Sequence, residues 1–350
     1  MGYLRYPPYF ARFRCTASAC AHNCCLAGWE IDIDDDTLAR YMQLGGACGE
    51  RLRASIALPP DGSEECAHFI LDGQGRCPFL NSRNLCDLYA QLGAQSLCQV
   101  CAEHPRYYDC FSGGTETGVG LCCEAAAALI LQQTEEPVWT SKADDGFEPP
   151  DYTDAERSAE AELFRMREQL FRALRDDAPQ DARMDALYRA AADMQDAVSP
   201  FPPDKRTTPG WTDMFWREDT LRRLLAFFLT LEINQPDWRD LLRRAQAMLP
   251  ALLRHRRDFL AFYRDRLYEY DRLAEYFLYR HFMGARWDGA VCGRVRFALI
   301  STGVIQLLGI QAWLTGGRLA PEQQIELCRR YSEEIEYDPD NVEQLAAYDL

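Results

Sequence analysis

Apolar residues in the second half of the chain repeat with the period of an α-helix. One stripe falls at positions i, i+3, i+4, i+7 and i+8 and consists of Leu221, Leu224, Leu225, Phe228 and Leu229. Arg222 and Arg223 lie on the other side of the same segment. A helix with this pattern buries its apolar face against a core. We expect it to begin with Asp213 as its N-cap and to be closed by Pro236.

Further helices are predicted in the same half of the chain. The expected ranges are 154–175, 183–197, 238–262, 291–314 and 321–335. The stretch 199–210 contains four prolines in twelve residues, so it is expected to separate two of these helices. No alternation of strands and helices is found here, which predicts an all-α bundle or array.

One uncharged stretch, 297–317, is long enough to be mistaken for a membrane span. Four polar side chains are spread through it: Ser301, Thr302, Gln306 and Gln311. Each of these polar groups would cost free energy in hydrocarbon. We therefore expect a buried core helix here and no membrane contact.

The stretch 112–120 is rich in glycine, but it lacks the strand, loop and helix that surround a dinucleotide-binding loop. The alternating residues on either side instead predict a β-hairpin over 107–121. Its turn is expected at Gly113 and Gly114.

Cysteine placement divides the chain into two parts. Thirteen of the fifteen cysteines occur in the first 123 residues. After them, 134–152 combines prolines and acidic residues with few apolar ones, as a linker does. We expect a cysteine-rich metal or cluster module over residues 1–145 and a helical domain over residues 146–350. The predicted fold class is mainly α, with one short hairpin inside the module and an all-α domain after it.

Charge and the N-terminal sequence restrict the partners and the compartment. The chain has 38 Lys and Arg residues against 54 Asp and Glu, a net charge of -16. This field repels phosphate backbones, so we expect no nucleic-acid partner. The first residues show no signal-peptide pattern, which predicts a cytoplasmic protein. Disulfides are rare in that compartment, so the thiols require another role.

Short spacings between cysteines favour a metal centre. Cys15, Cys20 and the adjacent pair Cys24 and Cys25 lie within eleven residues, so their thiols can meet at little loop-closure cost. Thiolates bind zinc, iron and iron-sulfur clusters, and a site needs about four of them. We therefore expect metal or cluster binding. One centre with spare cysteines and two centres fit the number of thiols equally well.

The order of these motifs resembles the flagellin lysine-N-methylase family, FliB, and more distantly the small zinc- or iron-chelating CxxCxxCC domain. The resemblance covers most of residues 9–130, whereas the helical remainder agrees only in size and character. The matching positions are 9–15, Cys20, Cys24-Cys25, Gly28-Trp29, 31–34, 77–81, Leu85-Cys86, Leu92-Gly93, Leu97-Cys98, Cys101, Pro105-Arg106, Cys122 and 124–126. The chain departs from the family at Cys123, usually a proline, and at Ala127, often an arginine.

The resemblance implies transfer of methyl groups from S-adenosylmethionine to lysines of flagellin, with an iron-sulfur cluster of the 4Fe-4S type and with zinc or iron as the alternative. The cysteines that match the family's thiol positions, and so would ligate the metal, are Cys15, Cys20, Cys24, Cys25, Cys77, Cys86, Cys98, Cys101 and Cys122. The cysteines that match none, Cys48, Cys66, Cys110, Cys292 and Cys328, are expected to be packing residues. The C-x3-C-x2-C loop of radical enzymes with the same donor is not formed, because position 27 is Ala27.

N-methylation requires a neutral amine aimed at the methyl carbon of a sulfonium. Glu124 and Glu103 are candidates for the base or for a group that orients the cation, and each also fits a helix-end or surface acid. His255 and His281 are expected to be structural histidines. No donor-binding residues are indicated by the sequence.

Two other functions stay open at this point. The first is a non-catalytic zinc- or iron-binding or cluster-carrying protein that docks a partner through its helical domain. The second is a thiol redox sensor that forms reversible disulfides without metal. Affinity for S-adenosylmethionine discriminates against the first, and metal analysis of anaerobically purified protein discriminates against the second.

Overall fold

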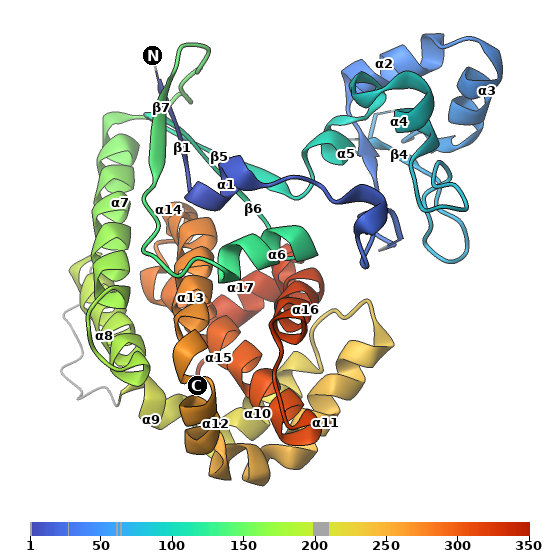
Figure 1. The fold of residues 1–350 in the computed structure, drawn as a ribbon. Helices are drawn as coiled ribbons and strands as arrows, with labels where there is room; N and C mark the ends of the chain where they lie inside the picture. Colours follow the sequence, from blue (N-terminus) through green and yellow to red (C-terminus); the bar gives the residue numbers. More distant parts are fainter. Residues whose placement is uncertain (1, 27, 61, 64, 199–209) are drawn as a thin grey trace. The chain divides into compact units, whose positions relative to one another are not determined.

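The computed structural model describes residues 2–26, 28–60, 62–63, 65–198 and 210–350. The chain folds into two compact units (Figure 1). We call them the large unit, residues 1–12, 108–122 and 126–350, and the small unit, residues 13–107 and 123–125. The domain division expected at residue 145 stays a prediction.

The large unit contains a mixed four-stranded sheet with the strand order β5-β6-β1-β7. Its strands are β5 (Arg106–Phe111), β6 (Gly114–Val119), β1 (Gly2–Tyr6) and β7 (Thr140–Asp144). β5 and β6 form the predicted hairpin, but Gly114 already belongs to β6 and the turn lies at Ser112 and Gly113. β1 pairs parallel to β6, and a Cβ atom on Gly114 would lie 2.2 Å from the carbonyl oxygen of Tyr3. The sheet therefore requires a residue without a side chain where the turn was expected.

Helices make up most of the remaining chain, which confirms the mainly helical fold class. In the large unit, α1 (Pro8–Arg12) precedes β6. The helices that follow β6 along the chain are α6 (Glu124–Leu131), α7 (Asp154–Leu174), α8 (Gln180–Val198), α9 (Trp211–Phe215), α10 (Glu218–Phe228), α11 (Pro236–Arg254), α12 (Arg256–Phe262), α13 (Tyr268–His281), α14 (Ala285–Asp288), α15 (Val291–Gly316), α16 (Pro321–Tyr331) and α17 (Pro339–Ala347). A π-helical turn, Ser332–Glu336, continues α16. Within the described residues, the region after residue 145 contains helices and no strand, as predicted.

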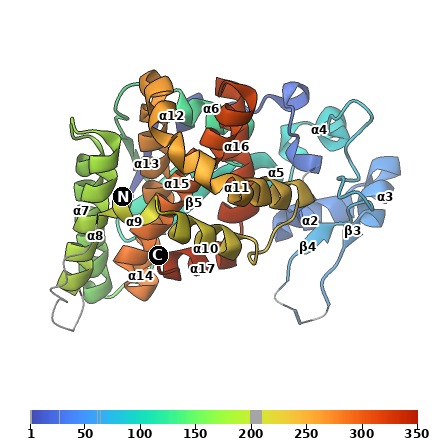
Figure 2. The ribbon, with the colours of Figure 1, turned by 90° about the horizontal axis from the view of Figure 1, so that it is seen from below.

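α15 forms the core of the large unit. It packs against α13, α8, α17, α11 and α16 (Figures 1 and 2). Among the described residues it is also the one helix long and apolar enough to cross a membrane, and 78% of its most apolar window is buried inside the protein. Ser301 and Thr302 donate hydrogen bonds of 2.7 and 2.8 Å to backbone carbonyls one turn earlier, which satisfies their hydroxyl groups in the core. The predicted core helix is therefore confirmed.

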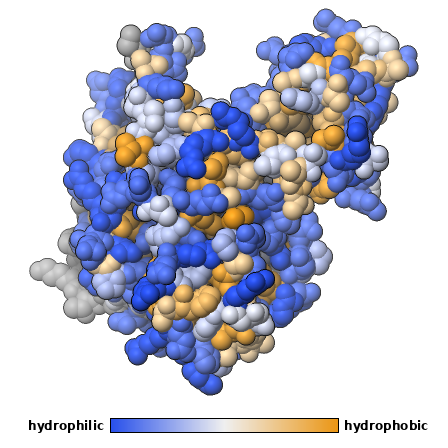
Figure 3. Space-filling model, in the orientation of Figure 1, coloured by the Kyte–Doolittle hydropathy of each residue, from blue (hydrophilic) through white to orange (hydrophobic). Residues whose placement is uncertain are grey.

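Most apolar side chains lie inside the large unit. On the face shown in Figure 3, hydrophilic side chains cover most of its surface and apolar ones form scattered patches. Scattered apolar side chains of this kind are normal for a folded protein surface.

Three predicted helix boundaries are wrong. Asp213 lies inside the short helix α9, and α10 begins only at Glu218, because Trp211 and Phe215 stack and are buried as a separate turn. Pro236 opens α11 at its first turn, where a missing N–H costs nothing, instead of closing the preceding helix. The helix expected over 238–262 is interrupted at His255, which ends α11 and precedes α12. The proline-rich separator, 199–210, lies outside the described residues except for Gly210.

A fully buried ion pair joins the sheet to α7 in the large unit. Both Glu116 side-chain oxygens, on β6, accept a hydrogen bond from Arg167 at 2.7 Å. Neither side chain is more than 3% exposed. Arg167 also donates to the backbone carbonyl of Tyr279 on α13 at 3.1 Å, and Arg5 on β1 approaches Glu116 to 3.3 Å. The pair of Glu116 and Arg167 thus connects four elements of the fold.

The small unit is built on a three-stranded antiparallel sheet with the order β2-β4-β3. Its elements are β2 (Asp32–Ile33), α2 (Asp35–Gln43), α3 (Gly46–Ala54), β3 (Ile56–Ala57), β4 (Ala67–Phe69), α4 (Asp87–Leu92) and α5 (Gln99–Glu103). This sheet was not predicted, because strands of two or three residues show too little alternation to be read from the sequence. Its core includes Ile33, Tyr41, Phe69, Phe79 and Cys98.

Replacing Asp34 by alanine is expected to lower the free energy of unfolding by about 1–2 kcal/mol. Its carboxylate accepts the backbone N–H of Thr37 at 2.9 Å as N-cap of α2, and that of Gln99 at 2.8 Å. Burial raises the pKa of Asp34, but these N–H groups together hold it below the ordinary value of 3.8. The stabilisation is therefore complete above pH 3.8 and is lost as pH falls through the lower folded pKa.

Urea unfolding of the wild-type protein and of Asp34→Ala, at neutral pH and at about pH 3, measures this effect. The difference between the two proteins should shrink at the acidic pH. Glu50→Ala, an exposed acid on α3, serves as the control and should change stability by less than about 0.5 kcal/mol. An equal loss in Asp34→Ala and Glu50→Ala would contradict the capping role.

Candidate functional site

Two cysteine-bearing loops of the small unit are held together by backbone contacts. The N–H of Cys77 donates to the carbonyl oxygen of Cys25 at 3.0 Å. Beside this contact Gly28 and Gly75 cross so closely that a Cβ atom on Gly75 would lie 2.7 Å from the Cα of Gly28. Both glycines have positive φ, at 81° and 74°. The segment around the adjacent cysteines is thus docked onto the segment that carries Cys77.

The next turn places Cys86 beside Cys77 in the fold. The side-chain oxygen of Asn81 accepts the N–H groups of Arg83 at 2.9 Å and Leu85 at 3.2 Å, which folds the chain back on itself. Leu80 and Cys86 then face each other in an antiparallel bridge. The residues of this turn are those that carried the family resemblance, and their role here is to bring two thiols to one core.

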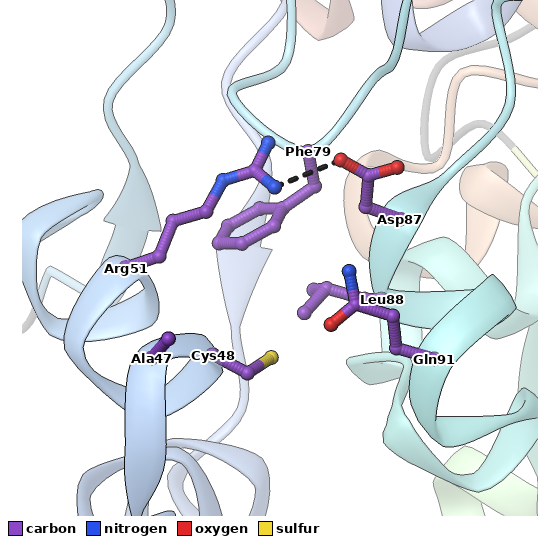
Figure 4. Close-up of a pocket in the computed structure, with 7 residues that line it drawn as sticks. All are labelled: Ala47, Cys48, Arg51, Phe79, Asp87, Leu88 and Gln91. Carbon is purple, nitrogen blue, oxygen red and sulfur yellow. Dashed lines mark hydrogen bonds and ion pairs between the residues drawn. The ribbon is translucent and has the colours of Figure 1, made fainter.

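Arg51 of α3 clamps this turn from outside. Its guanidinium pairs with Asp87 at 2.8 Å, donates to the carbonyl oxygen of Pro78 at 2.6 Å and lies 4.8 Å from the ring centre of Phe79. Figure 4 shows these side chains around a small cavity of about 150 Å³, with the sulfur of Cys48 directed toward it. Small-molecule sites have volumes of about 300–1,000 Å³. This cavity is smaller, so we interpret it as a gap in the packing around Arg51.

Six cysteines share one core in the small unit, Cys48 among them, and we call the five that match the family's thiol positions the thiol cluster: Cys25, Cys77, Cys86, Cys98 and Cys101. Cys77 and Cys98 are buried, and the other three are partly buried against them. Charges on Cys77 and Cys86 act on Cys25, and charges on Cys25 and Cys77 act on Cys101. The fold therefore gathers residues that lie up to 76 positions apart in sequence within electrostatic reach of each other.

Hydrogen bonds between neighbouring thiols lower the pKa of one cysteine in each of two close pairs. The hydrogen bond from Cys25 lowers the pKa of Cys24 to about 7, and the pKa of Cys25 is raised in return. In the same way the hydrogen bond from Cys101 lowers the pKa of Cys98. Because the thiolate is the form that binds metals, the lowered pKa favours ligation by Cys24 in the first pair and by Cys98 in the second.

The donor chemistry of the thiol cluster fits zinc or an iron-sulfur cluster, since both are held by soft thiolates. In the described part of the chain, however, no group of three or more His, Cys, Asp or Glu side chains is arranged so that it could hold a metal ion as it stands. The thiols thus gather in one core without converging on one point. Ligation by these residues stays a prediction.

The remaining predicted ligands lie elsewhere. Cys15 is exposed, and Cys20 interacts with Cys123 and Glu124, with burial raising the pKa of Cys20 to about 11. Cys122 belongs to the large unit. Cys15, Cys20 and Cys24 therefore do not belong to the core that holds the thiol cluster, although Cys24 is hydrogen-bonded to Cys25.

Among the cysteines expected to be packing residues, Cys328 is buried, and Cys48 and Cys292 are partly buried. The expectation is wrong for Cys66 and Cys110, which are exposed. A single cysteine forms no periodic pattern, so the sequence does not show whether its side chain on a loop or an edge strand is buried or exposed.

The two candidate catalytic acids occupy helix ends. Glu124 lies in the first turn of α6 and accepts the backbone N–H of Ala21 at 3.0 Å. Glu103 ends α5 and accepts a hydrogen bond of 3.4 Å from the side chain of Gln99. Neither lines the cavity of Figure 4 or the cleft described next, and a catalytic part for either stays a prediction.

The large unit contains a cleft of about 350 Å³ that the sequence analysis did not identify. Its walls include Asp109, Arg280, His281, Arg286, Trp287 and Glu336. They come from β5, from the end of α13, from α14 and from the π-helical turn, so they meet only in the folded protein. π-helical turns occur frequently at functional sites.

Glu336 is the buried anion of this cleft. Its carboxylate accepts a hydrogen bond of 2.7 Å from Tyr276, lies 2.9 Å from Nε2 of His281 and 3.2 Å from Arg280, and is also bonded by Ser332. Burial raises its pKa, but Arg280 and His281 outweigh this and hold the pKa of Glu336 below the ordinary value. His281 is thus hydrogen-bonded, as expected, and it also lines the cleft.

The strand end beside the cleft leaves no room for a side chain unless Tyr337 and Arg280 move. A Cβ atom on Gly120 would lie 2.0 Å from the hydroxyl oxygen of Tyr337 and 2.9 Å from the guanidinium of Arg280. The glycine-rich stretch of the sequence therefore indicates close packing at this wall of the cleft as well as the predicted hairpin.

The fold and these two sites define a mainly helical protein with a thiol-rich small unit and a ligand-sized cleft in its helical unit. Residues 185–348 match the FliB lysine N-methylase C-terminal domain. This match confirms the predicted resemblance to the FliB family. The expectation that the helical remainder agrees only in size and character is wrong, because this match lies within it.

Curated relatives agree with the family match. The flagellar biosynthetic protein FliU of Salmonella muenchen is 27% identical over 131 residues, which cover 37% of this chain and 77% of the relative. The lysine-N-methylases of Salmonella typhimurium and Salmonella choleraesuis are 27% and 26% identical over 131 residues. The matched region spans about a third of the length of these two enzymes, at 32%. No solved structure matches this chain.

Proposed function

We propose that this protein is a protein-lysine N-methyltransferase that transfers methyl groups from S-adenosylmethionine to lysines of flagellin in the cytoplasm. The observation that carries the proposal is the match of residues 185–348 to the lysine N-methylase C-terminal domain. Two relatives are named lysine-N-methylases and a third is named a flagellar biosynthetic protein, which supports the reaction and the flagellar substrate. The acidic surface expected from a net charge of -16 suits a lysine-bearing partner.

The chemistry asks two things of the protein. S-Adenosylmethionine supplies an electrophilic methyl group on a sulfonium. The protein must hold a lysine side chain in line with that methyl group and accept the proton that its ammonium group loses. Burial lowers the pKa of His281, in the wall of the cleft, by more than the nearby carboxylate of Glu336 raises it. The imidazole is therefore neutral at neutral pH and can accept a proton. Glu336 then stabilises the imidazolium through the contact at 2.9 Å.

We further propose that the small unit holds an iron-sulfur cluster of the 4Fe-4S type, with the thiol cluster as the source of its ligands. The support is the gathering of five thiols in one core and the lowered pKa of Cys98 within it. Zinc or iron ions are the alternative, since thiolates bind them as well. No reaction step is assigned to this centre.

Mass spectrometry of flagellin from cells with and without the gene tests the methyltransferase proposal. We expect lysines of flagellin to carry one or more methyl mass increments in the first cells, to lose them in the second, and to regain them when the wild-type gene is restored. Flagellin that is equally methylated in both strains would reject flagellin as the substrate. Purified protein that binds iron but has no affinity for S-adenosylmethionine would instead favour a non-catalytic metal-binding protein.

A further inference from the structure

We propose that the cleft of the large unit is the binding site of the methyl donor, an adenosyl amino acid, with Arg286 binding its carboxylate and Trp287 stacking on its adenine ring. This inference rests on the proposed function, because it assigns the place of a donor that the function requires. The cleft volume of about 350 Å³ lies within the range of about 300–1,000 Å³ for small-molecule sites.

Arg286 is a cation of the cleft that no carboxylate of the described residues neutralises. Its guanidinium lies 4.7 Å from the ring centre of Phe111 and 4.7 Å from that of Trp287, and Nη1 donates to the carbonyl oxygen of Cys110 at 3.1 Å. These contacts hold the planar group in place before a ligand binds. A fixed guanidinium is the side chain best suited to bind a carboxylate through two hydrogen bonds.

The other two arginines of the cleft are already paired. Arg280 lies 3.2 Å from Glu336. Arg294 is paired with Asp288 and with Glu343 at 2.7 Å. The charge available to an anionic ligand in this cleft is therefore that of Arg286.

Asp109 provides the complementary negative charge. It lines the same cleft and forms no ion pair with any of the described residues, although its charge acts on His281. A cleft with an uncompensated cation and an uncompensated anion suits a ligand that carries both charges, such as the carboxylate and the cationic groups of an adenosyl amino acid. The sulfonium donor adds a positive charge that its neutral thioether product lacks.

Trp287 provides a surface for a planar ring. It is 72% exposed, although an indole is a large apolar side chain. Arg286 lies against its ring, so this side chain sits beside the proposed carboxylate position. Aromatic side chains bind nucleobases by stacking, and an exposed tryptophan at the mouth of a cleft is arranged for that contact.

Isothermal titration calorimetry of the purified full chain with S-adenosylmethionine and S-adenosylhomocysteine tests the assignment. We expect Arg286→Met and Trp287→Ala each to raise Kd for both ligands by about tenfold or more. Arg286→Lys keeps the charge but loses the planar fork, so it should fall between wild type and Arg286→Met. Asp109→Asn should weaken binding of the sulfonium more than binding of the thioether.

Matched controls lie outside the cleft. Arg264→Met removes an arginine whose side chain is 80% exposed, and Phe262→Ala removes an aromatic ring that is 50% exposed. Both should change Kd by less than about twofold. Circular dichroism of each variant establishes that it is folded. Unchanged donor binding in folded Arg286→Met and Trp287→Ala, or a loss equal to that in the controls, would overturn the assignment, as would wild-type protein that binds neither ligand.

Flagellin methylation by the same variants separates this inference from the proposed function. If methylation persists with an unchanged KM for the donor in Arg286→Met and Trp287→Ala, the donor binds elsewhere and the methyltransferase proposal stands. If the wild-type protein binds the donor and these variants do not, yet no lysine is methylated, the site stands and the proposed function fails. If the variants keep donor affinity but lose affinity for a lysine peptide, the cleft is a peptide site and the donor assignment is overturned.

Discussion

Cys98→Ser is expected to abolish the brown iron-sulfur absorption of the anaerobically purified protein. The Cys98 side chain is fully buried and is hydrogen-bonded to Cys101 in the thiol cluster, and Cys98 is the N-cap residue of α5. A cluster of the 4Fe-4S type is held by four thiolates, and a serine hydroxyl is a harder and poorer ligand. Loss of the ligand should therefore remove both absorption and bound iron. Visible spectra with iron and sulfide quantification measure the effect.

Two cysteines outside the small unit provide controls. Cys328→Ser alters a thiol that is as buried as Cys98 but lies on α16, and Cys292→Ser alters a partly buried thiol on α15. Both variants should keep the absorption. If all three variants lose it equally, the ligand assignment is wrong. A wild-type protein that contains zinc and shows no absorption would favour the zinc alternative.

Variants of the first cysteine segment test the family pattern against the spatial grouping. The family pattern predicts loss of the absorption in both Cys20→Ser and Cys24→Ser. In the structure Cys24 is hydrogen-bonded to a member of the thiol cluster, whereas Cys20 lies beside Cys123 and Glu124. Retention of the absorption in Cys20→Ser together with its loss in Cys24→Ser would show that the spatial grouping identifies the ligands.

Glu116→Leu is expected to lower the free energy of unfolding by about 3–5 kcal/mol. The carboxylate of Glu116 neutralises Arg167, whose side chain is 0% exposed, through two hydrogen bonds of 2.7 Å. Without it, Arg167 would be a buried charge with no carboxylate, and the link between β6 and α7 would be lost. Urea unfolding followed by circular dichroism measures the change.

The comparison with an exposed pair on the same helix isolates the effect of burial. Glu162→Gln breaks the ion pair with Arg165, whose side chain is 69% exposed, and should cost less than about 1 kcal/mol. The double variant Glu116→Leu with Arg167→Met removes both buried charges and should recover part of the stability lost in the single variant. A free energy of unfolding of Glu116→Leu within about 1 kcal/mol of the wild-type value would contradict this account.

The helical half of the fold was largely predictable because the pattern that indicates a helix lies within the helix's own residues. α7 and α15 were expected at 154–175 and 291–314 and are observed at 154–174 and 291–316. Their patterns depend on residues three and four apart, which are neighbours in any helix. Boundaries were less predictable, since the break at His255 depends on packing against other elements.

The sites were predictable only in part. The cysteine order led to the family, but the side-chain grouping into a thiol cluster and a separate Cys20 group did not follow from spacing. The cleft was missed because Asp109 and His281 are 172 positions apart and carry no shared motif. Glycine at 120 was the one local signal of this wall, and its meaning became visible only with Tyr337 opposite it.

The amino-acid sequence by itself determined the mainly helical class, the core character of α15 and the resemblance to the FliB family, because periodicity and motif order are local properties of the chain. Only the tertiary structure decided the parallel pairing of β1 with β6, the burial of Glu116 against Arg167 and the cleft between β5, α13, α14 and the π-helical turn. These features arise from contacts between residues far apart along the chain, and such contacts depend on how all the elements pack at once.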